Sequence, residues 1–308
     1  MQTILITGGT GLVGRALARL LVERGYKVII LTRRLPGGAI PDNISYALWD
    51  INKQQIDVQA VQRADYIVHL AGAGVVAKKW TPAYKKEIIE SRTNSSQLII
   101  DTLKNHSNSI KAVISASAIG WYGADAGAWR FTETSPAKKD FLGETCRLWE
   151  ESIEPVTTSG IRLVKLRIGI VLSNDGGALL EFKKPLRFGI AAVLGSGKQM
   201  ISWIHIDDLC RLFIYAIENE NIKGSYNAVA PTPVNNKELN IKMARAIRGK
   251  FYIPVHIPAF LLKLLLGKRS VEVLKSTTVS CEKIKKTGFV FLYPSIEAAL
   301  HEFTTKNK

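Results

Sequence analysis

Short apolar runs alternate with segments of helical periodicity along the first 172 residues. The apolar runs predict strands at 3–7, 27–32, 66–72, 112–118 and 162–172. Between them, amphipathic patterns predict helices at 14–25, at 85–106 and around 142–159. Because the runs are continuously apolar, both faces of the strands are expected to be covered, which is typical of a parallel sheet built from βαβ units.

The pattern changes after Leu172. Glycine and proline interrupt residues 174–199, a helix is expected after 205–209, and 226–231 could add one more strand. The rest of the chain is mostly helical. The sequence therefore predicts an α/β fold, a Rossmann-type doubly wound parallel sheet with a smaller, mainly helical C-terminal substrate domain. The predicted domains are a nucleotide domain at 1–170, to which 200–230 returns, and a second domain formed by 171–199 and 231–308.

Composition narrows the class of protein. The 308 residues are 46% hydrophobic, which is enough for a sizeable core, and no apolar run reaches the roughly 20 residues needed to span a bilayer. The chain starts without the pattern of a secretion signal, and its three cysteines are scattered. These features predict a cytoplasmic protein.

Charge adds an expectation about partners. The net charge is +16, and residues 244–308, with twelve Lys/Arg and four Glu, carry +8 of it. The aromatic residues of this region do not interleave with the basic ones, so no nucleic-acid partner is expected. A basic surface of this kind would suit a small anionic substrate.

The stretch "ILITGGTGLVGRALARLL" (4–21) places a glycine-rich turn between a strand and a helix. Gly8, Gly11 and Gly14 follow one another at steps of three. Glycines here permit a tight turn, and the unpaired N–H groups at the start of a helix attract phosphate. This context predicts a dinucleotide site, and a glycine-rich turn without a ligand is the simpler alternative.

The end of the second strand indicates which dinucleotide binds. Sites for NAD usually place Asp or Glu there, whereas this chain has Thr32, Arg33 and Arg34. Arginine can bind a 2′-phosphate through two parallel hydrogen bonds. NADP(H) is therefore the predicted cofactor; alternatively one or both arginines are only solvated, more so Arg34.

Longer motifs continue through the whole chain. They are "HLAGAG" (69–74), "AKKWT" (77–81), "ESRTNSS" (90–96), "SASAIGWYG" (115–123), "FLGETCRLWE" (141–150), "LRIGIVLSNDGGAL" (166–179), "GSGKQMISWIHIDDL" (195–209) and "YNAVAP" (226–231). With them the chain resembles the extended short-chain dehydrogenase/reductases, and among these the atypical NAD-dependent epimerase/dehydratase-like group, the nucleoside-diphosphate-sugar epimerase family proteins. The resemblance implies a cofactor over the carboxyl ends of the strands and a small domain that closes on substrate. It also implies a possible homodimer.

The resemblance implies a set of cofactor-binding residues. Arg33 would meet the 2′-phosphate, while Trp49 and Asp50 would lie near the adenine. The remaining residues of the expected set are Gly8, Gly11, Leu12, Val13, Gly14, Arg34, Leu70, Ala71, Gly72, Ala73, Ser115 and Arg167. Arg92 stands where many relatives have asparagine; the alternative is an exposed helical ion pair with Glu87 or Glu90.

The catalytic pattern of the family is missing. Relatives carry Tyr-x-x-x-Lys on one helix, where the lysine holds the nicotinamide ribose and lowers the tyrosine pKa. Aligned on Glu150, these two positions are Leu142 and Cys146. Neither can replace the pair, and Cys146 is expected to be a thiol in the helix core. Ser117 is then the candidate catalytic residue, since it matches a serine that bonds the substrate in relatives.

Three further residues are candidates for substrate binding. They are Tyr122, Trp203 and His205. For Trp203 the alternative is a core position, and for His205 it is a structural role at the start of the helix near Asp207 and Asp208. The five histidines are far apart without metal-ligand spacing, so no metal is expected.

Three functions are compatible with these residues. The first is an NADP(H)-dependent epimerase or oxidoreductase that acts on a sugar nucleotide or another small carbonyl compound. The second is a non-catalytic NADPH-binding sensor or interaction protein, in line with the missing Tyr/Lys pair and with the cell-division-inhibitor label of some relatives. The third is peripheral membrane attachment through "AFLLKLLLGKR" (259–269), for which a helix of the small domain is the simpler interpretation.

Overall fold

The computed structural model describes residues 1–38, 41–125 and 130–305. An eight-stranded sheet forms its centre, in the order β13-β7-β6-β5-β1-β2-β3-β4. Within this sheet β4 runs antiparallel to β3, and the other neighbours pair in parallel. The strands are β1 (Thr3–Thr7), β2 (Lys27–Thr32), β3 (Ile44–Asp50), β4 (Gln55–Ile56), β5 (Tyr66–His69), β6 (Ala112–Ala118), β7 (Arg162–Ile168) and β13 (Gly224–Ala228). The predicted doubly wound parallel sheet is confirmed.

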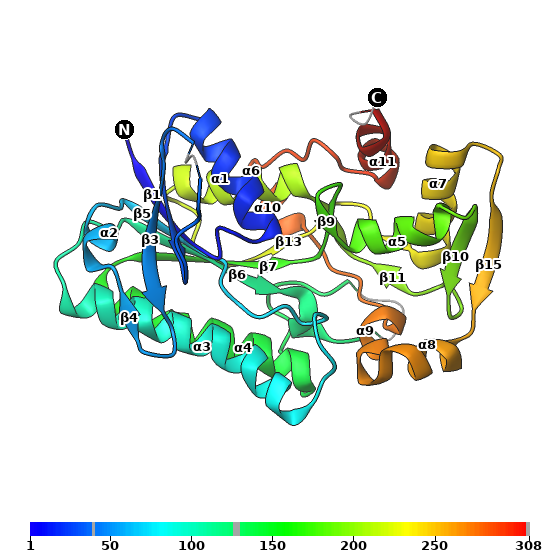
Figure 1. Ribbon diagram of the computed structural model, residues 1–308, viewed down its shortest axis with the longest axis horizontal. Helices are drawn as coiled ribbons and strands as arrows, with labels where there is room; N and C mark the ends of the chain where they lie inside the picture. The colour runs from blue at the N-terminus through cyan, green and yellow to red at the C-terminus, as the bar shows by residue number, and fades with distance from the viewer. Residues whose placement is uncertain (39–40, 126–129, 306–308) are drawn as a thin grey trace.

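Helices cover both faces of the sheet (Figure 1). One face carries α1 (Leu12–Glu23) and α6 (Ile206–Glu218), and the other carries α2 (Val58–Gln62), α3 (Pro82–Asn105) and α4 (Phe141–Ile153). Successive side chains of β1 point to opposite faces of the sheet. Ile4 and Ile6 therefore join the hydrophobic core on one face, while Leu5 joins the core on the other. This double coverage explains why the strands read as continuous apolar runs.

The order of the strands places a switch point beside β1. The chain adds β2 and β3 on one side of β1, and later β5, β6 and β7 on the other. In open α/β sheets a ligand binds at the carboxyl ends of the strands where the order reverses in this way. A ligand is therefore expected at the loops that follow β1, β2 and β5.

The long strand predicted at 162–172 is divided into two. β7 ends at Ile168, and β8 (Ile170–Ser173) leaves the main sheet to pair with β12 (Trp203–His205). The break falls at Gly169, where a Cβ atom would lie 2.7 Å from the carbonyl oxygen of Ser202. The close approach of the second chain segment therefore ends the strand, which periodicity alone does not reveal.

The C-terminal half combines helices with small sheets, drawn on the right of Figure 1. β13 and α6 belong to the main sheet and its cover, whereas the segments around them do not. No helix in the described part of the chain is long and apolar enough to cross a membrane. The two-domain division stays a prediction. The remaining elements are β9 (Gly176–Gly177), α5 (Ala178–Leu186), β10 (Ile190–Leu194), β11 (Met200–Ile201), β14 (Val234–Asn235), α7 (Asn236–Arg248), β15 (Ile253–Ile257), α8 (Ala259–Leu266), α9 (Ser270–Leu274), α10 (Glu282–Lys285) and α11 (Ile296–Thr305), with 3-10 turns at Ile119–Tyr122, Glu154–Ser159 and Gly267–Arg269.

Candidate functional site

The loop from β1 to α1 is shaped by its glycines. Gly8 has a φ of +68°, and a Cβ atom on it would lie 2.9 Å from the carbonyl group of Leu70. A Cβ on Gly14 would lie 2.4 Å from the carbonyl oxygen of Gly8. α1 therefore begins directly against the loop. Its N-cap residue, Gly11, has no side chain to cap the helix, and the first turn contains no acidic residue.

This helix start suits an anion. The first N–H groups of a helix lack partners within the helix, and the helix dipole adds partial positive charge there. Leu12, Val13 and Gly14 provide these groups at the start of α1. The loop thus fits the phosphates of a dinucleotide by its backbone geometry and not only by its sequence.

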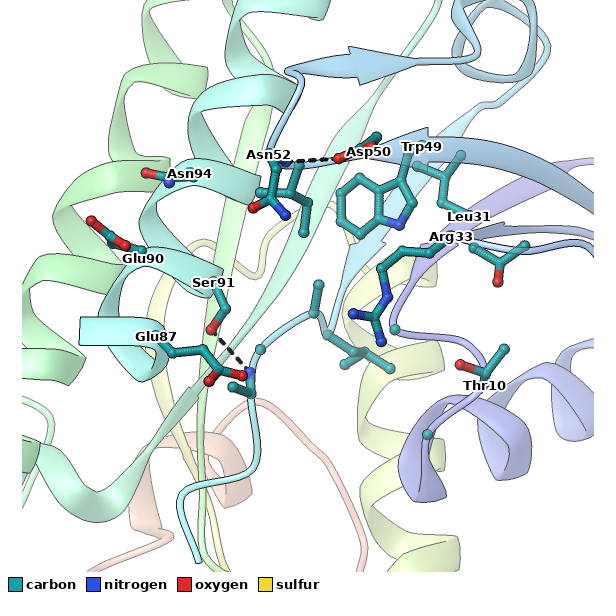
Figure 2. Close-up of a pocket in the computed structure, with 18 of the residues that line it drawn as sticks. Thr10, Leu31, Arg33, Trp49, Asp50, Asn52, Glu87, Glu90, Ser91 and Asn94 are labelled. Carbon is teal, nitrogen blue, oxygen red and sulfur yellow. Dashed lines mark hydrogen bonds between the residues drawn. The ribbon is translucent and has the colours of Figure 1, made fainter. Parts of the chain in front are cut away.

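A pocket of about 1160 Å³ opens at the switch point (Figure 2). Predicted cofactor residues make up much of its wall: Gly8, Gly11, Arg33, Arg34, Asp50, Leu70, Ala71, Gly72 and Ala73. α3 supplies the opposite wall, which includes Glu87, Glu90, Ser91 and Asn94. The expected strand at 66–72 ends at His69, so residues 70–73 are free to line the pocket.

The end of the pocket beside β2 and β3 combines an aromatic side chain with arginines. Figure 2 shows Arg33 and Trp49 side by side, facing the space between β3 and the glycine loop. Asp50 accepts the backbone N–H groups of the two residues Asn52 and Lys53, which shapes the turn after β3. Within the described chain no carboxylate pairs with Arg33, so its charge is available to a ligand.

Five predicted cofactor residues are absent from the wall of this pocket: Leu12, Val13, Gly14, Ser115 and Arg167. Ser115 is buried in β6 and donates its hydroxyl hydrogen to the carbonyl oxygen of Ala116. Arg167 is buried in β7, where Nε and Nη2 donate to the carboxylate of Glu150 at 2.7 and 3.0 Å. Its guanidinium also stacks on the ring of Trp121. Both side chains are engaged inside the protein and neither lines the pocket, so their roles at the cofactor stay predictions.

A buried histidine that the sequence did not single out, His69, connects the elements that surround the pocket. Thr7 Oγ1 accepts two backbone N–H groups that follow β5, so its own hydrogen goes to Nδ1 of His69 at 2.8 Å. Nε2 of His69 then donates toward the hydroxyl oxygens of Ser95 and Ser96, each at 3.3 Å. These bonds join β1, β5 and α3. Burial, with a contribution from the charge of Arg92, lowers the pKa of His69 to about 3.

This histidine predicts a loss of stability in acid. Above pH 6.5 the ring is neutral in both states; between pH 6.5 and 3 only the unfolded chain takes up the proton, so folding weakens as the pH falls. We expect the free energy of unfolding to drop by about 2 kcal/mol between pH 7 and pH 5 from this group. Urea denaturation across this range checks it. A His69→Gln variant should show a smaller slope, and an equal slope would contradict the assignment.

Helix α4 lacks a proton relay. Its sequence, FLGETCRLWEESI, contains neither Tyr nor Lys. Leu142 and Cys146 are buried, and burial raises the pKa of the Cys146 thiol to about 12. A thiol with this pKa is a poor nucleophile near neutral pH, which supports the interpretation of Cys146 as part of the helix core.

Ser117, the candidate catalytic residue, belongs to a buried polar cluster. Its hydroxyl donates to Oε1 of Glu150 at 2.7 Å, and the same carboxylate binds Arg167 and accepts the Ser225 hydroxyl at 3.1 Å. Lys165 lies 3.8 Å from Glu150. Because its hydrogen is already donated, Ser117 would have to rotate before it could donate to a substrate carbonyl group. Its catalytic role stays a prediction.

The structure gives the three predicted substrate residues internal positions. Tyr122 donates to Asn227 at 2.6 Å, and Trp203 donates its indole N–H to the carbonyl oxygen of Thr232. His205 is the N-cap of α6 and accepts the N–H of Asp207. All three side chains are buried, and none is among the residues that line the pocket. The simpler interpretation of Trp203 and His205 is the one that fits.

His205 also belongs to a small polar group. Its Nε2 lies 3.1 Å from Glu302, and its ring stacks on Tyr293 and Phe303. Burial lowers the pKa of His205. His205, Asp207 and Glu302 bring possible ligand atoms within 4.8 Å of one another, but both ring nitrogens already have protein partners. The expectation that the protein needs no metal stays a prediction.

Arg92 does not form the surface ion pair, and its correspondence to the asparagine of relatives stays a prediction. Glu87 pairs with Lys78 and Glu90 with Lys86, so neither pairs with Arg92. The side chain of Arg92 is buried against Gly72, and its Nη1 donates to the carbonyl oxygens of Ala73 and Ile88. Sequence distance to the glutamates suggested a surface pair, whereas the packing of α3 on the loop after β5 turns the side chain inward.

A doubly wound parallel sheet with a glycine-lined pocket at its switch point defines a Rossmann-type nucleotide-binding protein. The family comparisons agree with this class. Residues 4–142 match the model of the NAD dependent epimerase/dehydratase family, and residues 257–303 match a domain of unknown function, DUF1731. An epimerase family protein of Staphylococcus aureus is 35% identical over 99% of this chain and 100% of its own length. The chain therefore belongs to the epimerase family.

Solved structures extend the comparison. A human epimerase family protein, solved with NADPH, has a TM-score of 0.86 and 28% identity, over 98% of this chain and 99% of its own. A nucleoside-diphosphate sugar epimerase from Corynebacterium glutamicum has a TM-score of 0.78 and 31% identity, over 99% of this chain and 58% of its own. The predicted family and fold are confirmed.

Proposed function

We propose that the protein binds NADP(H) in preference to NAD(H) in the pocket at the switch point. The observation that carries this proposal is the pair Arg33 and Arg34, which line the end of the pocket beside β2 without a carboxylate partner in the described chain. A 2′-phosphate would neutralise this charge, whereas the 2′-hydroxyl of NAD would leave it uncompensated. The human relative solved with NADPH supports the same choice.

The residues around the pocket divide the work of binding. The N–H groups at the start of α1 would hold the pyrophosphate, and the loop 70–73 would border the ribose beside it. Trp49 offers an aromatic face at the end where the adenine would lie. Bound NADP(H) would supply hydride transfer. We propose a sugar nucleotide or another small carbonyl compound as substrate, in keeping with the names of the family and of the Corynebacterium relative.

One observation favours a second function, that of a non-catalytic NADPH sensor or interaction protein. The helix that carries the proton relay in relatives has no Tyr or Lys here, and the thiol at one of the two positions is buried. Addition of carbonyl compounds and sugar nucleotides to the NADPH-loaded protein separates the two functions. Net oxidation of NADPH, or conversion of a sugar nucleotide into its epimer by the NADP⁺-loaded protein, supports the enzyme; cofactor and compounds that stay unchanged in both tests support the sensor.

An Arg33→Ala variant tests the choice of cofactor. We expect NADPH to bind the variant about 10- to 100-fold more weakly, because a charge-assisted contact with the phosphate is lost. NADH should bind wild type and variant equally weakly. Titration by fluorescence measures both. Arg15→Ala is a matched control from the first turn of α1, since Arg15 donates to the carbonyl oxygen of Thr10 and is absent from the pocket wall.

Two outcomes of this titration would contradict the proposal. If wild-type protein binds neither nucleotide, the pocket is not a dinucleotide site. If NADH binds as tightly as NADPH, Arg33 and Arg34 do not select the cofactor. The homodimer and the cytoplasmic location stay predictions.

A further inference from the structure

Arg92 lies on the side of the switch point that faces away from the adenosine end of the pocket. Arg33, Trp49 and Asp50 occupy the ends of β2 and β3 on one side of β1. Arg92 contacts Gly72 in the loop after β5, on the other side. A dinucleotide that places its pyrophosphate at α1 and its adenosine over β2 and β3 must extend its second half over β5 and β6. Arg92 itself is not in the pocket wall, but it packs directly behind Gly72, which is, and so lies next to the loop that this half would cross.

The charge of Arg92 has no counterion among the residues that the structure describes. Arg92 is only 8% exposed, and no carboxylate of the described chain pairs with it. The Arg92 side chain donates two hydrogen bonds, both from Nη1 and both to backbone carbonyl oxygens. Burial lowers the pKa of Arg92. A buried charge of this kind is costly unless something else neutralises it.

The other donors of Arg92 remain free. Nε and Nη2 have no hydrogen-bond partner among the described residues. Neither belongs to the fully buried atoms that lack a partner, so both keep some exposure to solvent. The guanidinium is held in place on both sides. A Cβ on Gly72 would lie 2.9 Å from its Cζ, and the ring centroid of Trp149 lies 4.8 Å from Cζ. The group is thus fixed in position with unused donors.

Arg162 shows what a purely structural arginine looks like in the same protein. It is half-buried at the start of β7, and burial likewise lowers its pKa. Nη1 and Nη2 both donate, to three carbonyl oxygens at the end of α6 and just beyond it: those of Ala216, Ile217 and Ile222. These acceptors carry the negative end of the helix dipole. Arg92 has no comparable set of acceptors.

Helix α4 presents no cation of its own to this region. Its arginine, Arg147, is paired on the surface with Glu144 and Glu151. Arg92 reaches α4 from α3, where it packs on Trp149, and its charge acts on the thiol of Cys146 against the effect of burial. Of the cations that act on this thiol, Arg92 comes from α3, and its effect is larger than that of Lys275.

We propose that Arg92 forms a binding subsite for the second half of the dinucleotide, the ribose and phosphate that carry the nicotinamide. The free Nε and Nη2 donors bind oxygen atoms of this half, and the ligand supplies the acceptors that the protein does not. This inference rests on the proposed binding of NADP(H). It makes Arg92 a positioning residue for the nicotinamide end of the cofactor.

Two ligands and two arginine variants test the subsite. Purified full-length protein is titrated with NADPH and with adenosine 2′,5′-bisphosphate, which lacks the second phosphate, its ribose and the nicotinamide. Arg92→Gln should bind NADPH about tenfold or more weakly and the bisphosphate within about twofold of wild type. Arg92→Lys should retain part of the NADPH affinity. Arg33→Ala, in contrast, should weaken both ligands.

The controls separate binding from folding. Arg162→Gln should lower the melting temperature and leave both affinities unchanged. Binding of the bisphosphate shows that an Arg92 variant is folded, and Arg92→Lys replaces Arg92→Gln if the latter does not fold. Equal NADPH affinity in wild type and the Arg92 variants overturns the subsite alone, as does an equal loss for both ligands. Failure of wild type to bind NADPH overturns the proposed function itself.

Discussion

A Glu150→Ala variant is expected to lose about 3–5 kcal/mol of unfolding free energy. Glu150 is 4% exposed and is the shared acceptor for Arg167, at 2.7 and 3.0 Å, and for the hydroxyls of Ser117 and Ser225. Without the carboxylate, the guanidinium of Arg167 keeps its charge inside the protein with its main partner gone. The desolvation cost of that charge then counts fully against folding.

Urea denaturation of the variant measures the loss. Glu144→Ala is a matched control from the same helix, because its carboxylate pairs with Arg147 at the surface and its removal should change stability little. A double variant, Glu150→Leu with Arg167→Met, should be more stable than Glu150→Ala, since it removes both charges. If Glu150→Ala is as stable as wild type, the cluster does not contribute as its geometry indicates.

A Gly14→Ala variant is expected to bind NADPH about 100-fold more weakly. The added Cβ would lie 2.4 Å from the carbonyl oxygen of Gly8 and 2.5 Å from Cα of Gly9. Both are backbone atoms, so the loop or the start of α1 must move. The N–H groups proposed to hold the phosphates would then no longer converge on the same phosphate. Because one hydrogen bond to a charged group contributes about 1.5–3 kcal/mol, loss of one or two of them accounts for the expected drop in affinity.

Titration with NADPH, beside a thermal melt, separates the loss of binding from unfolding. Gly25→Ala is the control at the opposite end of α1. Gly25 has a φ of +83° and open space around its Cα, so alanine there should cost about 1 kcal/mol of stability without changing the affinity. Wild-type affinity in Gly14→Ala would mean that the tight loop is not needed for binding.

The sequence predicted the elements that depend on local pattern. Apolar runs located β1, β2 and β6 at their observed bounds, because a strand covered on both faces is apolar along most of its length. The pocket wall could also be predicted from the sequence, since Gly8, Gly11, Arg33 and the loop 70–73 follow strand ends, where a parallel sheet binds ligands.

Predictions that required knowledge of side-chain direction were less successful. Arg167 was expected at the cofactor and His205 at the substrate, yet both are buried among partners from other segments. Arg92, for which a surface ion pair was one of two alternatives, instead crosses from α3 to α4. Each of these partners lies at least 17 residues away in the sequence, so no local pattern records the contact.

The sequence by itself thus determined the Rossmann-type sheet, the family, and a glycine loop followed by two arginines. Strand periodicity and turn chemistry are local properties, so they can be read directly from the order of residues. Only the tertiary structure decided which polar groups face the pocket and which face one another. Glu150 neutralises Arg167, while Arg92 lacks a carboxylate partner in the described chain, and this difference arises because charge compensation depends on distances between elements.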